Sequence, residues 1–152
     1  MGRPLRGPEP RYRKLQFEET AETMSKSTDI RICEVQTRRQ QIDYRTPIKF
    51  GGRVVRDVTV VAAKVLVEDR QGRRAPGYGS MTMGNVWAWP SPSLDATATL
   101  SAMLEFVEVL TERVNGIEEI GDPLQLTLQM AAEYPDIRSV IGRALGDEKA
   151  MP

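Results

Sequence analysis

Residues 58–68 form the clearest β-prone run, in which Thr59, Val61, Ala63, Val65 and Val67 alternate with Val58, Val60, Ala62, Lys64 and Leu66. A period of two is typical of a β-strand with one face turned toward a core. The buried face is expected to carry Thr59, Val61, Ala63, Val65 and Val67. A shorter β-prone run over residues 30–37, continuing as polar strand or loop to Tyr44, predicts a strand before it.

Glycine and proline indicate where these strands turn. Residues 46–52 contain Pro47 and the pair Gly51-Gly52, so we predict a first loop there. The sequence Asp69-Arg70-Gln71-Gly72 is typical of a tight hairpin turn, after which residues 73–81 return as a third strand. The three strands form an antiparallel meander.

A helical period follows the strands. Residues 95–114 carry an apolar stripe at spacings of three, four and seven, with Ser93 as the expected N-cap and Gly116 as the end. Asp122 followed by Pro123 predicts the start of a second helix. Pro135 should interrupt that helix, and Asp136 should restart a short one that runs to Leu145.

The order of elements predicts an α+β fold, a three-stranded antiparallel β-meander followed by helices packed on one face. We divide the chain into a disordered polar tail (1–28), one domain (29–148) and a C-terminal tail (149–152).

Residues 79–92 contain several large apolar side chains together with glycine and proline, an unusual combination. We predict a second loop there. Its large or amide side chains are Met81, Met83, Asn85, Trp87 and Trp89.

The residue composition excludes several kinds of catalytic and metal site. The 152 residues include no histidine, so Ser-His-Asp and Cys-His catalysis and histidine metal sites are excluded. The single cysteine, Cys33, is interpreted as a small apolar residue within the first strand, and the acidic stretch 95–122 resembles an exposed helix face.

Because 21 basic side chains balance 21 acidic ones, we expect no nucleic-acid partner. Without a long apolar run, we expect no membrane partner and a cytoplasmic location.

Together these segments resemble a known family. The run Thr46-Pro47-Ile48-Lys49-Phe50-Gly51-Gly52, the valine-rich strand, the turn at Gly72 and the segment Pro76-Gly77-Tyr78-Gly79-Ser80 occur in the order of an N-terminal capping domain. That domain belongs to the mandelate racemase and muconate lactonizing enzyme branch of the enolase superfamily. The resemblance covers about residues 29–146, and it rests on the joint order of the segments, since none is decisive alone.

The resemblance implies a function. Family members join this cap to a (β/α) barrel that supplies the catalytic bases and the carboxylate ligands of Mg²⁺. This sequence has no residues to match those groups, so we assign it no catalytic residue, metal ligand or cofactor of its own. We expect a truncated lid domain, inactive alone, whose partners are the missing barrel and a small carboxylate or acid-sugar substrate.

In the family, two loops of the cap close over the barrel mouth and contact the distal part of the substrate. Residues at the corresponding positions here are Tyr44, Arg45, Lys49, Phe50, Met81, Met83, Asn85, Trp87 and Trp89. Core packing is the alternative for each tryptophan. Because the two lie two residues apart in an expected extended segment, we predict that one is buried and the other is near the surface.

A second function remains open. Between residues 38 and 56 the chain carries six basic side chains and one acidic side chain, Asp43. This segment could steer an anionic molecule, or it could be a solvated strand edge. The alternative function is therefore a stand-alone α+β binding module for an anionic partner. A cap without its barrel should also expose an apolar patch around both loops, so we expect self-association.

Overall fold

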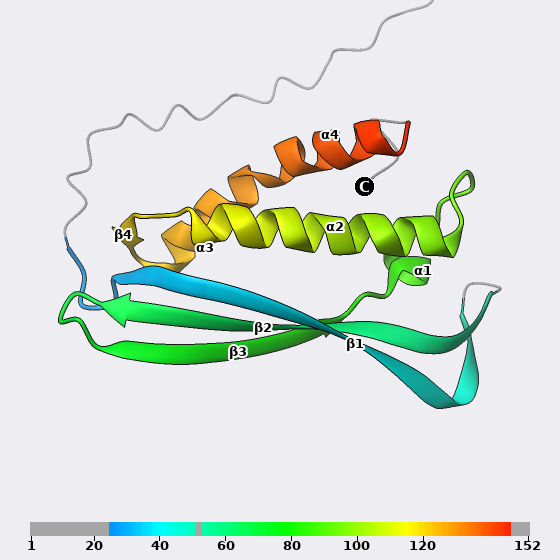
Figure 1. Ribbon diagram of the computed structural model, residues 1–152, viewed down its shortest axis with the longest axis horizontal. Coiled ribbons are helices and arrows are strands. Elements are labelled where there is room, and N and C mark those ends of the chain that lie inside the picture. The colour runs from blue at the N-terminus through cyan, green and yellow to red at the C-terminus, as the bar shows by residue number, and fades with distance from the viewer. Residues whose placement is uncertain (1–24, 51–52, 147–152) are drawn as a thin grey trace, which may run out of the picture.

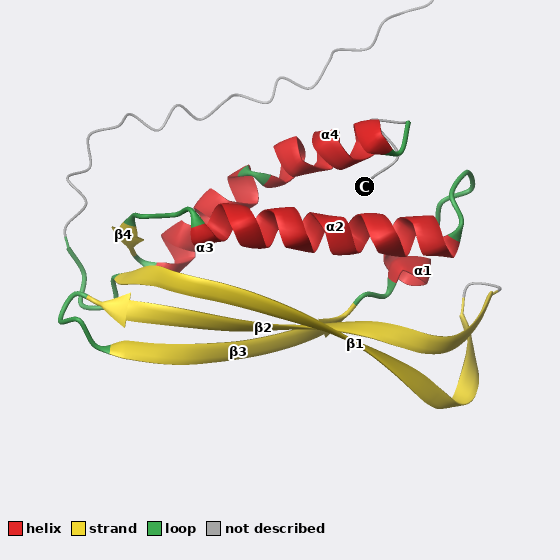
Figure 2. Ribbon diagram, in the orientation of Figure 1, coloured by secondary structure: helices red, strands yellow, loops and turns green. Residues whose placement is uncertain are grey.

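The computed structural model describes residues 25–50 and 53–146 (Figure 1). The strands are β1 (Ile30–Phe50), β2 (Arg53–Asp69), β3 (Arg74–Thr82) and β4 (Ile120–Gly121). The helices are α1 (Asn85–Ala88), α2 (Ala96–Asn115), α3 (Pro123–Ala132) and α4 (Tyr134–Ala144). Helices cover one face of an open antiparallel sheet with strand order β3-β2-β1-β4 (Figure 2). The α+β class is confirmed.

Most of the expected tail, residues 1–24, and the C-terminal residues 147–152 lie outside the described residues. The last residues of the expected tail contact the domain. The backbone N–H of Lys26 donates to Asp29 Oδ2 over 2.9 Å, and the Thr28 hydroxyl donates to Asp122 Oδ2 over 3.3 Å.

The first predicted loop is mostly strand. Residues 46–50 belong to β1 and pair with β2 through Ile48↔Val55, Lys49↔Val54 and Phe50↔Arg53, so the prediction of a loop from residue 46 was wrong. Pro47 falls inside a register shift between Asp43 and Ile48. A bulge tolerates a residue without an N–H donor, because one residue of a bulge is unpaired in any case. The hairpin therefore continues beyond the proline.

β2 orients its side chains as its alternation predicted. Val61 is buried, and Ala63, Val65 and Val67 on the same face are half-buried. The ion pair between Arg39, the partner of Val61 on β1, and Glu108 on α2 identifies this face as the one toward the helices. No described helix covers the opposite face of the sheet (Figure 2).

β3 forms one edge of the sheet. The predicted hairpin turn before it is confirmed, with Gly72 at φ 78°. At the two ends of the β2–β3 ladder, Asp69 N–H donates to the Arg73 carbonyl and Met83 N–H donates to the Thr59 carbonyl. Odd-numbered residues of β3 therefore bond to β2, and the nitrogen of Pro76 faces the open edge, where no donor is missed.

β4 adds a short strand beyond the expected meander, pairing Ile30↔Gly121 and Arg31↔Ile120. The side chain of Asn115 extends this edge. Its Oδ1 accepts from Val35 N–H over 2.7 Å, and its Nδ2 donates to the Val35 carbonyl over 3.0 Å. One side-chain amide thus satisfies the backbone of β1 as a neighbouring strand would.

Local signals set the helix ends. Asp95 caps α2 by accepting from Ala98 N–H over 2.7 Å, so the expected cap at Ser93 was wrong by two residues. Asp122 caps α3 as predicted, accepting from Leu124 N–H over 3.0 Å. Pro135 separates α3 from α4 and lies in the first turn of α4, where a proline fits because the first N–H groups have no helical partner. α4 consequently begins at Tyr134, before Asp136.

The core lies between α2, α4 and the segment after α1. Its buried members are Trp89, Ala102, Ile137 and Ile141, with Phe106 and Leu110 of α2 packed against them. The helices of the described residues are too short or too polar to cross a membrane.

Candidate functional site

A groove of about 610 Å³ lies between the distal half of the β1–β2 hairpin and the start of the helical layer. Toward its distal end β1 first dips away from the helices and then turns back up toward the level of α1 (Figure 1). The hairpin side of the groove is formed by Gln41, Tyr44, Ile48, Arg53, Val54, Val55, Arg56, Asp57, Val58 and Thr59. The other side is formed by Met83, Gly84, Asn85, Val86, Trp87, Ala96, Thr97 and Leu100. Two segments far apart in the sequence thus share one concave surface.

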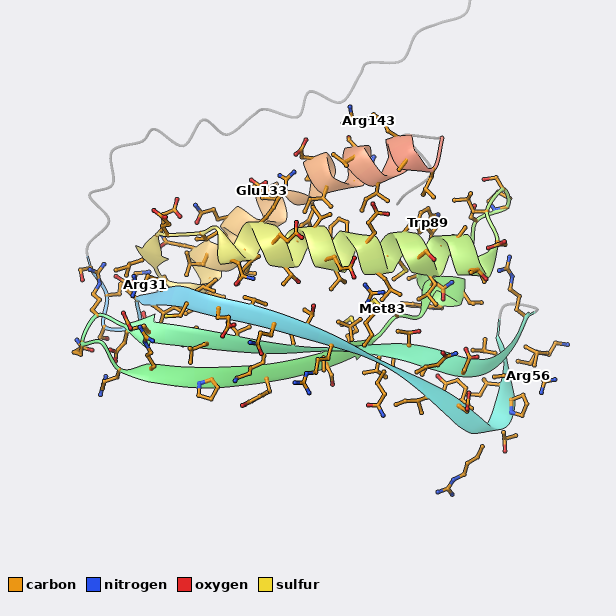
Figure 3. The ribbon with its side chains drawn as sticks, in the orientation of Figure 1. Arg31, Arg56, Met83, Trp89, Glu133 and Arg143 are labelled. Carbon is orange, nitrogen blue, oxygen red and sulfur yellow. The ribbon has the colours of Figure 1, made fainter. Side chains whose placement is uncertain are left out.

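Four of the nine sequence-predicted residues line this groove: Tyr44, Met83, Asn85 and Trp87. Met83 lies between the sheet and the helices (Figure 3). Arg45 and Lys49 are exposed on β1 and Met81 is exposed on β3, and none of these three lines the groove. The side chain of Phe50 lies outside the described residues.

The two tryptophans have opposite environments, as predicted. Trp87 is 71% exposed and lines the groove, whereas Trp89 is 6% exposed and belongs to the core. The reason differs from the expected one. The segment is not extended: Trp87 lies in the short helix α1, and Trp89 is the residue that follows the helix at its C-cap.

Asn85 fixes the helical side of the groove. Its Nδ2 donates to the Ala96 carbonyl over 2.6 Å and to Thr99 Oγ1 over 2.9 Å. Both Asn85 and Thr99 are buried. Because both amide hydrogens are used within the protein, Asn85 holds α1 against α2.

Arg53 and Arg56 line the groove but were not among the candidate residues. The signal that could have identified them is the basic run 38–56. Arg45, Lys49, Arg53 and Arg56 form no ion pair with any described residue. Arg56 extends from the distal hairpin (Figure 3). The distal hairpin therefore presents uncompensated positive charge beside an apolar wall.

Acidic side chains interrupt this positive region at one point. Asp43 and Asp57 are direct cross-strand partners, and Asp57 lines the groove. Like charges opposite each other in a sheet are destabilising. The positive character of the groove is thus concentrated toward Arg53 and Arg56.

Comparison with protein-family models, curated proteins and solved structures found no match for this chain.

The Mg²⁺ implied by the resemblance finds no matching donor set here. Among residues 25–50 and 53–146, no three or more carboxylate or thiol side chains gather in a way that could hold a metal ion. Several carboxylates have structural partners instead. Hydrogen bonds from Arg74 and then Arg31 lower the pKa of Glu68, and the backbone N–H of Lys26 followed by Arg70 lowers the pKa of Asp29.

Other carboxylates serve turns and helix ends. The backbone N–H of Arg73 lowers the pKa of Asp69 in the hairpin turn, and that of Leu124 lowers the pKa of Asp122 at the α3 cap. Asp136 and then Glu133 raise the pKa of Arg113, which lines a second, smaller cavity of about 400 Å³ between α2 and α3. That guanidinium is already paired with two carboxylates. None of these groups lines the groove.

Proposed function

We propose that this chain is a capping domain of the enolase-superfamily type, which recognises a carboxylate substrate and relies on a barrel for its chemistry. The observation that carries the proposal is the groove, which brings together Tyr44 from the first segment and Met83, Asn85 and Trp87 from the second. These segments correspond to the two substrate-contacting loops that the resemblance implies.

The walls of the groove suit a lid. Ile48, Val54 and Trp87 line it while remaining largely exposed to water. Closing such a surface over a reaction site excludes water, and this strengthens charge interactions inside the site. The short hydrogen bonds of Asn85 keep one wall in place, whereas the other wall is a long two-stranded hairpin.

The proposal assigns proton abstraction to the barrel, as the resemblance implies. Abstraction of a proton beside a carboxylate requires a positioned base and a cation or donors that stabilise the enediolate. The titratable side chains lining the groove are Tyr44, Arg53, Arg56 and Asp57. No lysine lines it, and no cluster for a metal is present in the described part of the chain.

The experiment is α-proton exchange in D₂O, followed by proton NMR with mandelate and gluconate as probes, with and without Mg²⁺. We expect no exchange above the rate without protein. Exchange that depends on the chain would overturn its assignment as a cap without its own chemistry. A complete enzyme of the family, run in parallel, establishes that the assay detects exchange.

A stand-alone binding module for an anionic partner is the second candidate, favoured by the four basic side chains without ion pairs on the distal hairpin. It predicts binding to a polyanion such as heparin that weakens steeply with added salt, because counterions are released on binding. The double variant Arg45→Gln/Lys49→Gln should then lose binding, while Arg38→Gln should not. A lid predicts no polyanion binding.

A further inference from the structure

The chemistry of the groove separates the two substrate classes left open by the proposed function. We infer that the groove accepts a carboxylate with an aromatic or branched apolar tail and discriminates against polyhydroxylated acid sugars. This inference rests on the proposed function and names the substrate class at the same site.

The first observation is the apolar wall. Ile48 is 48% exposed, Val54 57% and Trp87 71%, and all three line the groove. Met83, Val86 and Leu100 continue the same wall. Because exposed apolar area is favourable to remove from water, an apolar tail gains free energy by covering these side chains. Tyr44 and Trp87 add aromatic surfaces on opposite sides of the groove, which suit a ring.

The second observation is how the polar groups are used. Asn85 has committed both amide hydrogens to Ala96 and Thr99. A polyol brings several hydroxyl groups that must each exchange water for a protein partner, and an unmatched hydroxyl in a site is costly. The remaining uncharged polar side chains are spread over three elements, with Gln41 on β1, Thr59 on β2 and Thr97 on α2. The groove therefore offers a polyol no converging set.

The third observation is charge. Arg53 and Arg56 line the groove without an ion pair to any described residue, and they outnumber Asp57, the one carboxylate among the lining side chains. A guanidinium matches the two oxygens of a carboxylate, and it lies here beside the apolar wall. The cavity volume of about 610 Å³ falls in the range of small-molecule sites. An anionic head with an apolar tail is complementary to both parts.

Tryptophan emission provides a direct test. Trp87 lines the groove and Trp89 is buried in the core, and the chain has no other tryptophan. The full chain is titrated with 4-phenylbutyrate, 4-phenylbutanol and gluconate, with excitation selective for tryptophan. We expect a saturable change with phenylbutyrate, a weaker affinity for the uncharged alcohol, and no change with gluconate. Trp87→Phe should abolish the optical response.

Variants of the two arginines separate the contribution of the ligand's carboxylate to binding from that of its apolar tail. Arg53→Gln/Arg56→Gln should weaken phenylbutyrate binding by about fivefold, the upper range for exposed ion pairs, and leave the alcohol unaffected. Arg38→Gln is the matched control. Arg38 neighbours Arg39, which faces α2, so it lies on the opposite, open face of the sheet. That variant should bind phenylbutyrate like the unaltered chain.

The outcomes are distinguishable. Saturable gluconate binding without phenylbutyrate binding overturns the apolar class and leaves carboxylate recognition standing. Failure of both acids to bind overturns the proposed recognition function together with this inference. Equal affinity for the acid and the alcohol, unaffected by the Arg53 and Arg56 variants, overturns the assignment of these arginines to the carboxylate.

Discussion

The amide nitrogen of Asn85 lies 2.9 Å from the hydroxyl oxygen of Thr99, and this hydrogen bond joins α1 to α2. The same nitrogen also donates to the Ala96 carbonyl. Asn85 therefore links the segment that carries Trp87 to the helix that carries the core.

Replacing Asn85 with alanine should destabilise the fold by about 1–3 kcal/mol, because the buried Thr99 hydroxyl and the half-buried Ala96 carbonyl each lose a donor. Urea unfolding followed by circular dichroism measures the change. Thr97→Ala, an exposed position on the same helix, should change the free energy of unfolding by less than about 0.5 kcal/mol. Equal effects at both positions would contradict a tether at Asn85.

The tryptophans predict a sharp contrast in stability. Trp89→Ala should cost about 3–5 kcal/mol, because it leaves a cavity against Ala102 and Ile141. Trp87→Ala should change stability by about 0.5 kcal/mol or less, since its side chain is exposed. Thermal unfolding by circular dichroism measures both. If Trp89→Ala does not fold, Trp89→Phe provides the graded comparison, and a stable Trp89→Ala protein would show that this core is misassigned.

α4 offers a conservative test of the core. Ile141 is fully buried, whereas Val140 beside it is 43% exposed. Ile141→Val should lower the free energy of unfolding by about 0.5–1.5 kcal/mol, because a single buried methylene is removed. Val140→Ala should fall within about 0.5 kcal/mol of the unaltered chain. The reverse ranking in urea titrations would mean that α4 packs through another face.

Glu68 predicts a dependence of stability on pH. It accepts from Arg31 and Arg74, each over 2.6 Å, and so connects β1, β2 and β3 across the open face. These bonds lower its pKa in the folded state, so its contribution is present above its ordinary value of 4.5 and is lost as pH falls through the folded value.

Glu68→Gln should therefore lower the urea midpoint at pH 7 and flatten its fall between pH 5 and pH 3. Glu105→Gln, which removes an exposed carboxylate of α2, is the control and should retain the steeper fall. A pH profile unchanged by Glu68→Gln would contradict a stabilising role for the cross-strand ion pairs.

The exposed apolar side chains predict self-association. Ile48 and Val54 on the hairpin should make the average mass in light scattering rise with concentration. Ile48→Thr/Val54→Thr should reduce that rise. Leu124→Gln/Leu128→Gln removes two exposed apolar side chains from α3 and serves as the matched comparison. A monomer at all concentrations would contradict the prediction.

The sequence predicted those features whose cause is local. The strand around Val61 follows from its valine-rich run, the Asp122 cap from its carboxylate acceptor next to Pro123, and the turn from Gly72. The sequence-based prediction was wrong where secondary structure depends on pairing with residues far away in the sequence. Thr46 and the residues after it became strand because β2 supplies partners across the hairpin, and two residues of β4 form a strand only because β1 lies beside them.

The candidate site was predicted in part for the same reason. Tyr44 and Trp87, one from each predicted segment, both line the groove, but which side chains face it depends on hairpin twist and on the turn of α1. Arg53 and Arg56 were visible only as members of a basic run. Their position on the groove wall depends on the register shift before Ile48, which no local pattern encodes.

The amide of Asn115 and the ring of Pro76 both hinder the pairing of a second chain with the edges of the sheet. Each occupies a sheet border that could otherwise template another chain, one by saturating Val35 and the other by withholding a donor. Fibril-like growth should thus be resisted at these two borders. An Asn115→Ala change would reopen one of them and increase amyloid-dye binding on prolonged incubation.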